Sequence, residues 1–410
     1  MKFSLYYPND ADRSFQKLSD EAINDMSLDF ILDALTEIHA EKPQLRGLMT
    51  QLTSDPEVIR YRRDIFEDFL RFPQLRTAMS ELVLKLADLR DLERFQMDGD
   101  ASALWSLINR LREIDDYITC ITMIKNTLTG LDITSKGMKK LRQIVTDIAQ
   151  ESGFDALKAD IDEMMKKAQR IQSVTIGVNL DKFLRPEFAG IVSVNDTKFT
   201  DSGLMSRFKQ FTDSKDELHH GANLGKNQRF HPSNPSSKQL VTGTFQVSAA
   251  THDVHIDREN VTGKDPLSDA MRKQVTDIMR RTVNDIKSTI KKYVNINGYS
   301  LINLMSEITF YNRFAELTDR IMAAGMPMCK PEILPYETRD CSFKDIYNLK
   351  LAINKVGGED INIITNDFDF DEKHRIYILT GPNRGGKTIF TQAVGIAMMM
   401  AQWGVYVPAR

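Results

Sequence analysis

The segment Gly381-Pro-Asn-Arg-Gly-Gly-Lys-Thr388 stands near the end of this chain and has the spacing G-x-x-x-x-G-K-T. Apolar residues at 376–379 predict a buried strand before it, and residues 389–403 predict an apolar helix after it. At such a turn, glycines let the backbone wrap around an anion, which the inward amide groups and the helix dipole then attract. The sequence therefore predicts a phosphate-binding loop, also called a P-loop or Walker A loop, in a nucleotide-binding chain.

Each position of this loop has an expected part in binding. Lys387 is expected to reach the β- and γ-phosphates, and Thr388 is expected to offer its hydroxyl to Mg²⁺. The predicted contacts of the nucleotide in the loop are Gly381, Pro382, Asn383, Arg384, Gly385, Gly386, Lys387 and Thr388. The plainer interpretation is a glycine-rich turn that binds nothing, but it leaves the fit of both flanks unexplained.

A P-loop ATPase also needs an acidic residue at the end of a later strand, where it holds Mg²⁺ and helps to position the attacking water. Only 22 residues follow Thr388, and no apolar run among them ends in Asp or Glu. We therefore expect this chain by itself to bind ATP weakly and to hydrolyse almost none. We predict no catalytic residue within it.

Composition sets broad limits on the class of protein. The 410 residues suffice for two or three domains, and 27% charged with 41% hydrophobic residues is ordinary for a soluble globular chain. A net charge of −3 means that any DNA contact would come from local basic patches. Three well-separated cysteines argue against a disulfide framework or a zinc site. Without a signal-like N-terminus or a membrane-spanning segment, the chain is expected to be cytoplasmic, with no membrane contact.

The first 170 residues are predicted to form a helical core or lever domain. Asp55-Pro56-Glu57 is typical of a helix start, and Phe72-Pro73 closes that helix and opens the next. From residue 75 to residue 148, leucine, isoleucine and methionine recur at steps of three and four, which predicts amphipathic helices that pack side by side. A continuous coiled coil is disfavoured because the pattern breaks repeatedly.

The remaining chain divides into three predicted segments. Residues 171–263 read as a small β-containing insertion, with a hairpin at 174–180 and 189–194 followed by a polar stretch. Residues 264–335 are predicted to form long lever helices at 266–293 and 298–324, with a proline-rich linker. Residues 336–410 are predicted to be the incomplete N-terminal part of a P-loop ATPase domain, with further strands at 349–354 and 362–365.

The predicted helix at 266–293 carries a basic face. Lys273, Arg280 and Lys287 recur every seven residues and therefore share one side of a helix. This side could contact the phosphates of DNA. The alternative, which we favour, is a solvated surface with acidic partners such as Asp277 and Asp285.

The segment Ile378-Leu-Thr-Gly-Pro-Asn-Arg-Gly-Gly-Lys-Thr388, with Gly404-Val-Tyr-Val-Pro-Ala409 after one helix, resembles the ATPase domain of the MutS family. This pairing of G-P-N-x-G-G-K-[ST] with G-x-x-V-P-A is specific. Asn366-Asp367 and Lys330-Pro-Glu-Ile333 also resemble that family, and residues 54–66 and 84–94 resemble its early lever helices. The resemblance spans most of the chain but is sharp only from about residue 376.

The resemblance implies a mostly α-helical core or lever domain with a small β-containing insertion, followed by the start of an α/β P-loop NTPase domain. It further implies an ATP-switched clamp that acts in DNA repair or recombination control and uses ATP and Mg²⁺. The implied partners are branched or mismatched DNA and, for the full-length protein, a second copy in a homodimer. Family dimers complete each nucleotide site with residues of both subunits.

Some positions depart from the family pattern. Family mismatch readers carry an N-terminal domain with a Phe-x-Glu loop, whereas here Phe314-Ala315-Glu316 lies in a helical pattern that places Phe314 in the core. Arg384 stands where mismatch-repair members usually carry Met, and Ile363 stands where the family places an aromatic ring under adenine, so adenine would rest on an aliphatic face. The chain is thus expected to be a short form without the mismatch-reading domain, cut off inside the ATPase domain.

Two other functions fit parts of the sequence. An ABC-type or SMC-type ATPase shares the G-P-N loop and long helices, but usually has the loop before its coiled coil. A non-enzymatic helical scaffold that binds nucleotide or partners without turnover is the third possibility. DNA binding that depends on salt and ATP would argue against the scaffold.

Overall fold

The computed structural model describes residues 3–8, 15–97, 103–151, 153–170, 172–180, 182–183, 186–195, 231–232, 280–293, 301–338, 340–371, 373–382 and 385–410. Two predicted loop contacts, Asn383 and Arg384, lie outside these residues, as does most of the predicted polar insertion. The first part of the predicted helix at 266–293 also lies outside them. The described chain is mostly helical, as the sequence predicts.

The helices of the described chain, in order, are α1 (Asp20–Asp25), α2 (Leu28–Leu35), α3 (Lys42–Met49), α4 (Pro56–Arg71), α5 (Pro73–Met97), α6 (Ala103–Thr129), α7 (Lys136–Gln150), α8 (Phe154–Gln169), α12 (Arg280–Lys292), α13 (Asn303–Ala323), the 3-10 helix η3 (Tyr336–Thr338), α14 (Leu349–Val356) and α15 (Lys387–Trp403). The strands are β1 (Gln16–Lys17), β2 (Gln51–Leu52), β3 (Ser173–Leu180), β4 (Pro186–Asn195), β5 (His231–Pro232), β6 (Cys341–Ile346) and β7 (Asn366–Phe370). Among the helices described, none is long and apolar enough to cross a membrane.

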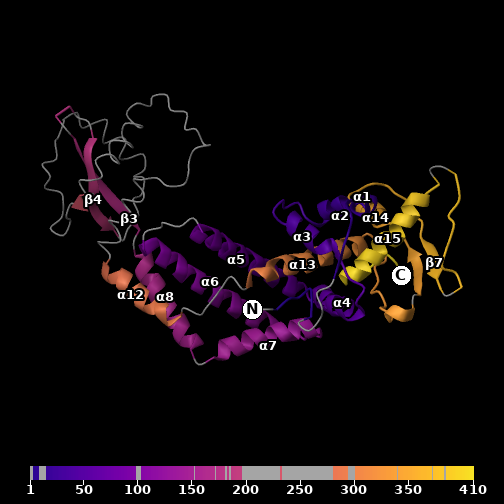
Figure 1. Ribbon diagram of the computed structural model, residues 1–410, viewed down its shortest axis with the longest axis horizontal. Helices are drawn as coiled ribbons and strands as arrows, with labels where there is room; N and C mark the ends of the chain where they lie inside the picture. The colour runs from indigo at the N-terminus through magenta and orange to yellow at the C-terminus, as the bar shows by residue number, and fades with distance from the viewer. Residues whose placement is uncertain are drawn as a thin grey trace. The chain divides into compact units, whose positions relative to one another are not determined.

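The chain forms two compact units. Unit 1 comprises residues 1–91, 116–154 and 297–410, and unit 2 comprises residues 92–115 and 155–296. Unit 1 thus contains the early helices together with the P-loop and the helix that follows it. Figure 1 follows the chain from the N-terminus to the C-terminus.

In unit 1, α4 begins and ends where the sequence predicts. The Asp55 carboxylate accepts a hydrogen bond from the amide of Glu57 at 2.8 Å, and Pro56 stands in the first turn. Phe72 caps the end of α4, and Pro73 starts α5. Both predicted boundaries of α4 are confirmed. They could be predicted because each depends on a local rule of backbone geometry.

Helix α13 packs against α2, α3 and α4 and forms much of the core of unit 1. Phe310 and Phe314 on this helix are fully buried, so the prediction that Phe314 is a core residue is confirmed. The N-terminal segment is fixed to the same helix: the Ser4 hydroxyl and the Leu5 amide each donate to the Glu307 carboxylate at 2.6 Å. The N-terminal segment therefore shares one core with a helix that lies about 300 residues later in the sequence.

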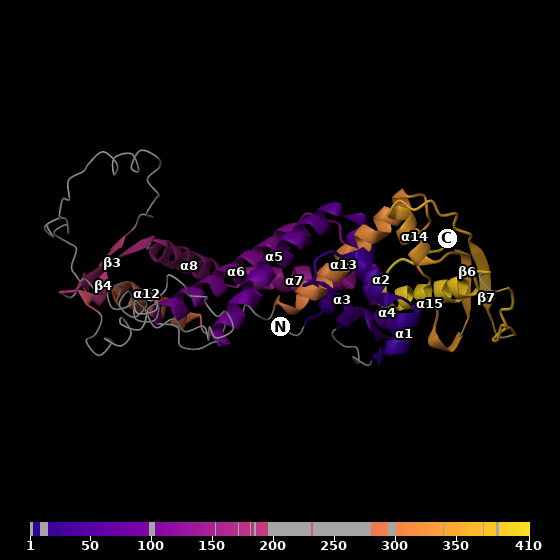
Figure 2. The ribbon, with the colours of Figure 1, turned by 90° about the horizontal axis from the view of Figure 1, so that it is seen from above.

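The last part of unit 1 combines a two-stranded sheet with two helices. Strands β6 and β7 pair antiparallel, with Cys341 opposite Phe370. Strand β6 begins at Cys341, within the region 336–410 that the sequence assigns to the ATPase domain, and the boundary at residue 336 stays a prediction. Both Figure 1 and Figure 2 place β7 beside α15, and the rings of Phe368 and Phe390 join them at 5.5 Å between centroids. Helix α15 confirms the helix predicted at 389–403.

Two predicted strands in this region are wrong. Residues 349–354 lie in α14, whose N-cap Asn348 accepts a hydrogen bond from the Lys350 amide at 2.9 Å. A short apolar run fits a buried helix as well as a strand, and here Leu349 and Ala352 are buried on one helical face. Residues 362–365 precede β7 instead of forming a strand themselves.

The strand predicted at 376–379 is also wrong in this structure. Ile376 and Ile378 are 88% and 87% exposed, and this stretch belongs to no strand of the described sheets. A buried strand needs neighbours that pair its backbone groups. The described residues provide none for this stretch.

In unit 2, strands β3 and β4 pair antiparallel and confirm the predicted hairpin, while β5 pairs with β4. Helix α12 lies along α8, where Lys292 contacts Asp160 at 2.9 Å and Tyr293 donates to the same carboxylate at 2.9 Å. In contrast to these polar contacts, the side chain of Ile286 on α12 is fully buried. The described part of this basic helix is therefore amphipathic.

Candidate nucleotide site

The predicted P-loop leads into α15, a helix for whose start the described residues provide no capping side chain. Its N-cap is Gly386, with φ 80° and ψ 3°. Glycine adopts this left-handed conformation at little cost. Because the N-cap provides no side-chain hydrogen bond, the first amide groups of this 17-residue helix can be satisfied by a ligand. Helix starts of this kind attract anions.

The loop itself is tightly turned. The Gly385 amide donates to the Pro382 carbonyl at 3.1 Å. A Cβ atom at residue 385 would lie 2.9 Å from that same oxygen. The second-to-last glycine of the motif is therefore required for close packing of the loop on itself.

Lys387 lies across the loop. Its ammonium group donates to the carbonyl of Gly381 at 2.5 Å and to the carbonyl of Pro382 at 2.9 Å. A phosphate would be a stronger acceptor for this cation, since it carries a full negative charge whereas a carbonyl carries only a dipole. Thr388, the predicted Mg²⁺ ligand, is exposed at the second position of α15.

A pocket opens beside the loop. Its lining residues from the loop and α15 are Leu379, Thr380, Gly385, Gly386, Lys387, Ile389, Phe390 and Ala393. The opposite wall consists of Ile346, Tyr347, Asn348, Leu351, Asn362, Ile364, Asn366 and Asp367. The pocket therefore lies between the P-loop and the segment before β7.

The predicted site residues are partly brought together by this pocket. Gly385, Gly386 and Lys387 line it. Ile363 is half-buried and does not line it, whereas its neighbours Asn362 and Ile364 do. The support of adenine by Ile363 stays a prediction.

The donor set fits a nucleoside triphosphate with Mg²⁺. The Lys387 ammonium and the uncapped amides of α15 are donors for phosphate, and the Thr388 hydroxyl is an oxygen ligand of the kind that Mg²⁺ accepts. Ile364 and Leu379 provide apolar surface on the pocket wall. Apolar walls with a few convergent polar groups are typical of small-molecule sites.

The far end of α15 is fixed to the early helices by Arg62, which sequence reasoning missed. This side chain is fully buried. It donates to the Tyr6 carbonyl at 2.9 Å and to the Gln402 carbonyl at 3.0 Å, and its guanidinium lies 3.5 Å from the centroid of the Tyr6 ring. Burial is the main cause that raises the pKa of Tyr6 to about 12, so its hydroxyl stays protonated. Trp403 adds a hydrogen bond to the Met49 carbonyl at 2.8 Å.

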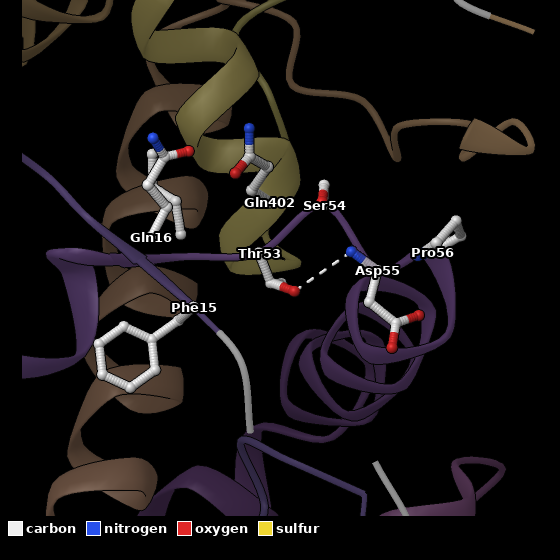
Figure 3. A pocket seen from close by; sticks show the side chains of 8 residues that line it. Phe15, Gln16, Thr53, Ser54, Asp55, Pro56 and Gln402 are labelled. Carbon is white, nitrogen blue, oxygen red and sulfur yellow. Dashed lines mark hydrogen bonds between the residues drawn. The ribbon is translucent and has the colours of Figure 1, made fainter. Parts of the chain in front are cut away.

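A second pocket lies at the start of α4. Figure 3 shows its lining, which includes Phe15, Gln16 and Gln402. Two of its polar side chains have internal partners, because Thr53 accepts from the Asp55 amide at 3.2 Å and Asp55 caps α4. These contacts stabilise the turn before α4 and the start of that helix. We assign no ligand to this pocket.

The charged residues of α12 are partly paired with α8. Lys292 contacts Asp160, and Asp285 contacts Lys167 of α8 at 3.7 Å. Lys287 and Lys291 are exposed. The solvated surface, which the sequence favours, and the phosphate contact both stay predictions.

Comparison with known proteins gives a consistent set of matches. Residues 54–324 match the family model described as "MutS2 N-terminal domain". The chain is 22% identical over 321 residues to the DNA mismatch repair protein MutS of Fervidobacterium nodosum, which covers 73% of this chain and 37% of that protein. It is 34% identical over 87 residues to the DNA mismatch repair protein spellchecker 1 of Drosophila melanogaster, covering 21% and 9% of the two chains.

A shorter match has higher identity. Over 47 residues the chain is 48% identical to Endonuclease MutS2 of Thermus thermophilus, covering 12% of this chain and 6% of that protein. The aligned parts span at most 37% of the length of these three relatives.

Proposed function

This chain belongs to the MutS family, and from that premise we propose that it binds ATP with Mg²⁺ at residues 381–388 and takes part in DNA repair or recombination control. The relatives described above carry the names of DNA mismatch repair proteins and of a MutS2 endonuclease. In the full-length protein, the proposal is a homodimeric clamp on branched or mismatched DNA that is switched by ATP.

One observation carries the nucleotide part of the proposal. The helix that follows the motif starts at a left-handed glycine with no capping side chain, and Lys387 bends back over the loop. Together they concentrate positive potential at one point of the pocket. This arrangement is the one that a phosphate group would need at the start of a helix.

The exposed stretch at 376–379 supports the same proposal. Ile376 and Ile378 carry large apolar surface in water, which soluble proteins seldom tolerate without a partner surface. We propose that this stretch becomes a buried strand beside further strands of a complete ATPase domain. The P-loop would then stand at the end of a strand, as its chemistry requires.

Nucleotide binding is tested by titrating the 410-residue chain with ATP and Mg²⁺ in a calorimeter. Lys387→Ala should weaken binding about a hundredfold, because it removes a charge-assisted contact to phosphate. Lys373→Ala is the matched control, since Lys373 is an exposed lysine outside the pocket lining. Equal affinity in both variants would contradict the proposal.

DNA binding is tested on the full-length protein with branched and mismatched duplexes at two salt concentrations. The proposal expects binding that weakens with salt and changes on addition of ATP. Binding that ignores ATP, or its absence on both duplexes, would favour the helical scaffold without a DNA clamp.

A further inference from the structure

The first turns of α15 are tied to the junction between α1 and α2. The side-chain amide of Gln392 donates to the Asp25 carbonyl at 2.6 Å and to the Ser27 hydroxyl at 3.1 Å. Asp25 is the last residue of α1, and Ser27 is the N-cap of α2. Gln392 therefore joins the P-loop helix to a point more than 360 residues away in sequence.

Asn348 extends this connection toward the loop. Its side chain is almost fully buried and donates to the Ile389 carbonyl at 2.9 Å and to the Gln392 side-chain oxygen at 3.1 Å. Ile389 lies in the first turn of α15. Both Asn348 and Ile389 line the pocket beside the P-loop. The chain of hydrogen bonds thus runs from the pocket wall to Ser27.

Ser27, which accepts the hydrogen bond from Gln392, has an unusual backbone conformation. Ser27 has φ 53° and ψ 45°, a left-handed conformation that serine adopts at a cost. Its hydroxyl accepts from Gln392 and also from the Lys350 ammonium at 2.9 Å. Beside it, Met26 lies so close to α15 that a Cβ atom at Gly395 would be 2.6 Å from its sulfur. The junction and α15 therefore fit together through both polar and close apolar contacts.

We propose that Gln392 is a positioning residue for nucleotide binding. Through Asn348 and Ser27 it holds the first turns of α15, and hence the uncapped amides and Lys387, in the orientation that receives phosphate. The affinity part of this inference rests on the proposed nucleotide function. By linkage, bound nucleotide would in turn stabilise the α1–α2 junction.

The experiment compares three variants of the 410-residue chain. Gln392→Ala removes the connection, and Ser27→Gly removes the hydroxyl while keeping a residue that tolerates left-handed backbone. Gln402→Ala is the control, a glutamine of the same helix outside the P-loop pocket. Amide hydrogen exchange of residues 390–393 is measured without ligand, and affinity is measured with a fluorescent ATP analogue and Mg²⁺.

We expect Gln392→Ala to speed exchange at residues 390–393 and to weaken analogue binding about tenfold, since it loses three hydrogen bonds. Ser27→Gly should weaken binding by a smaller factor without lowering the melting temperature. Exchange and affinity equal to those of the Gln402→Ala control would overturn the inference. If the unmodified chain binds no analogue, the proposed nucleotide function fails, and the exchange measurement then decides only whether Gln392 holds the first turns of α15.

Discussion

At the scale of single residues, Gly404 shows how closely α15 approaches α4. Gly404 ends α15 with φ 75°, and a Cβ atom there would lie 2.3 Å from the Cβ of Arg62. The backbone conformation and the contact each exclude a side chain. The buried guanidinium of Arg62, which holds the Gln402 carbonyl, depends on this close approach.

Gly404→Ala is therefore expected to destabilise the protein by about 3 kcal/mol, the sum of left-handed strain and overpacking. Gly325→Ala is the matched control, because Gly325 has φ 79° but a Cβ atom there would have no neighbouring atom within 4 Å among the described residues. It should cost about 1 kcal/mol, from strain alone. Urea denaturation of both variants measures the difference, and equal losses would mean that the contact with Arg62 contributes nothing.

At the scale of elements, α4 connects several parts of unit 1. Arg60 donates to the Ile333 carbonyl at 2.7 Å and so holds the linker after α13. Phe66 packs on Tyr406 with 5.7 Å between ring centroids. The fully buried Asp68 accepts from the backbone amides of Thr134 and Ser135, each at 3.0 Å, and so fixes the start of α7.

Asp68→Ala should cost about 3 kcal/mol, because it leaves buried backbone donors without their charged acceptor. Asp64→Ala on the same helix is the comparison. Asp64 is 42% exposed and pairs with its neighbour Arg63, so its loss should cost less than about 1 kcal/mol. Thermal unfolding of the two variants distinguishes them. Similar melting temperatures would show that the contact with α7 is energetically unimportant.

The elements also show what the sequence could predict. The start of α4 and the hairpin β3–β4 follow from caps and alternation, which depend on neighbouring residues only. Residues 376–379 have the composition of a buried strand, yet a strand exists only where another strand pairs with it. The strand predicted at residues 349–354 is wrong for a different reason, since a short apolar run fits either a strand or a buried helix.

The candidate site likewise contains residues that a local motif predicts and residues that depend on contacts distant in sequence. Lys387 and Gly386 belong to one local motif, so spacing alone predicted their place. Arg62 and Gln392 act through contacts with residues hundreds of positions away. Nothing in their immediate sequence distinguishes them from surface residues. Such contacts arise only when the whole of unit 1 has folded.

At the scale of the whole molecule, ion pairs join segments that are distant in sequence. Arg313 of α13 contacts the carboxylate of Glu41 at 2.8 and 2.9 Å across 272 residues. Burial works to raise the pKa of Glu41, but the hydrogen bonds from Arg313 and Thr36 lower it overall below the ordinary value of 4.5. A lowered pKa means that folding favours the ionised carboxylate.

This pair therefore contributes stability above the ordinary carboxyl pKa, and the contribution is lost as the pH falls through the lowered pKa of the folded state. The difference in unfolding free energy between the unmodified chain and Glu41→Gln should be largest near neutral pH and should shrink toward zero in acid. Chemical denaturation at several pH values measures it. A difference that stays constant with pH would contradict a role for the ionised pair.

The most direct measurement for the whole molecule is a crystal structure of the chain with a non-hydrolysable ATP analogue and Mg²⁺. We expect the phosphates to lie against the amides at the start of α15, with Lys387 turned from the carbonyls of Gly381 and Pro382 to the phosphate oxygens. We also expect Thr388 to bind the metal. A pocket without analogue at saturating concentration, with Lys387 still bonded to the loop carbonyls, would contradict the nucleotide site on which the proposed function depends.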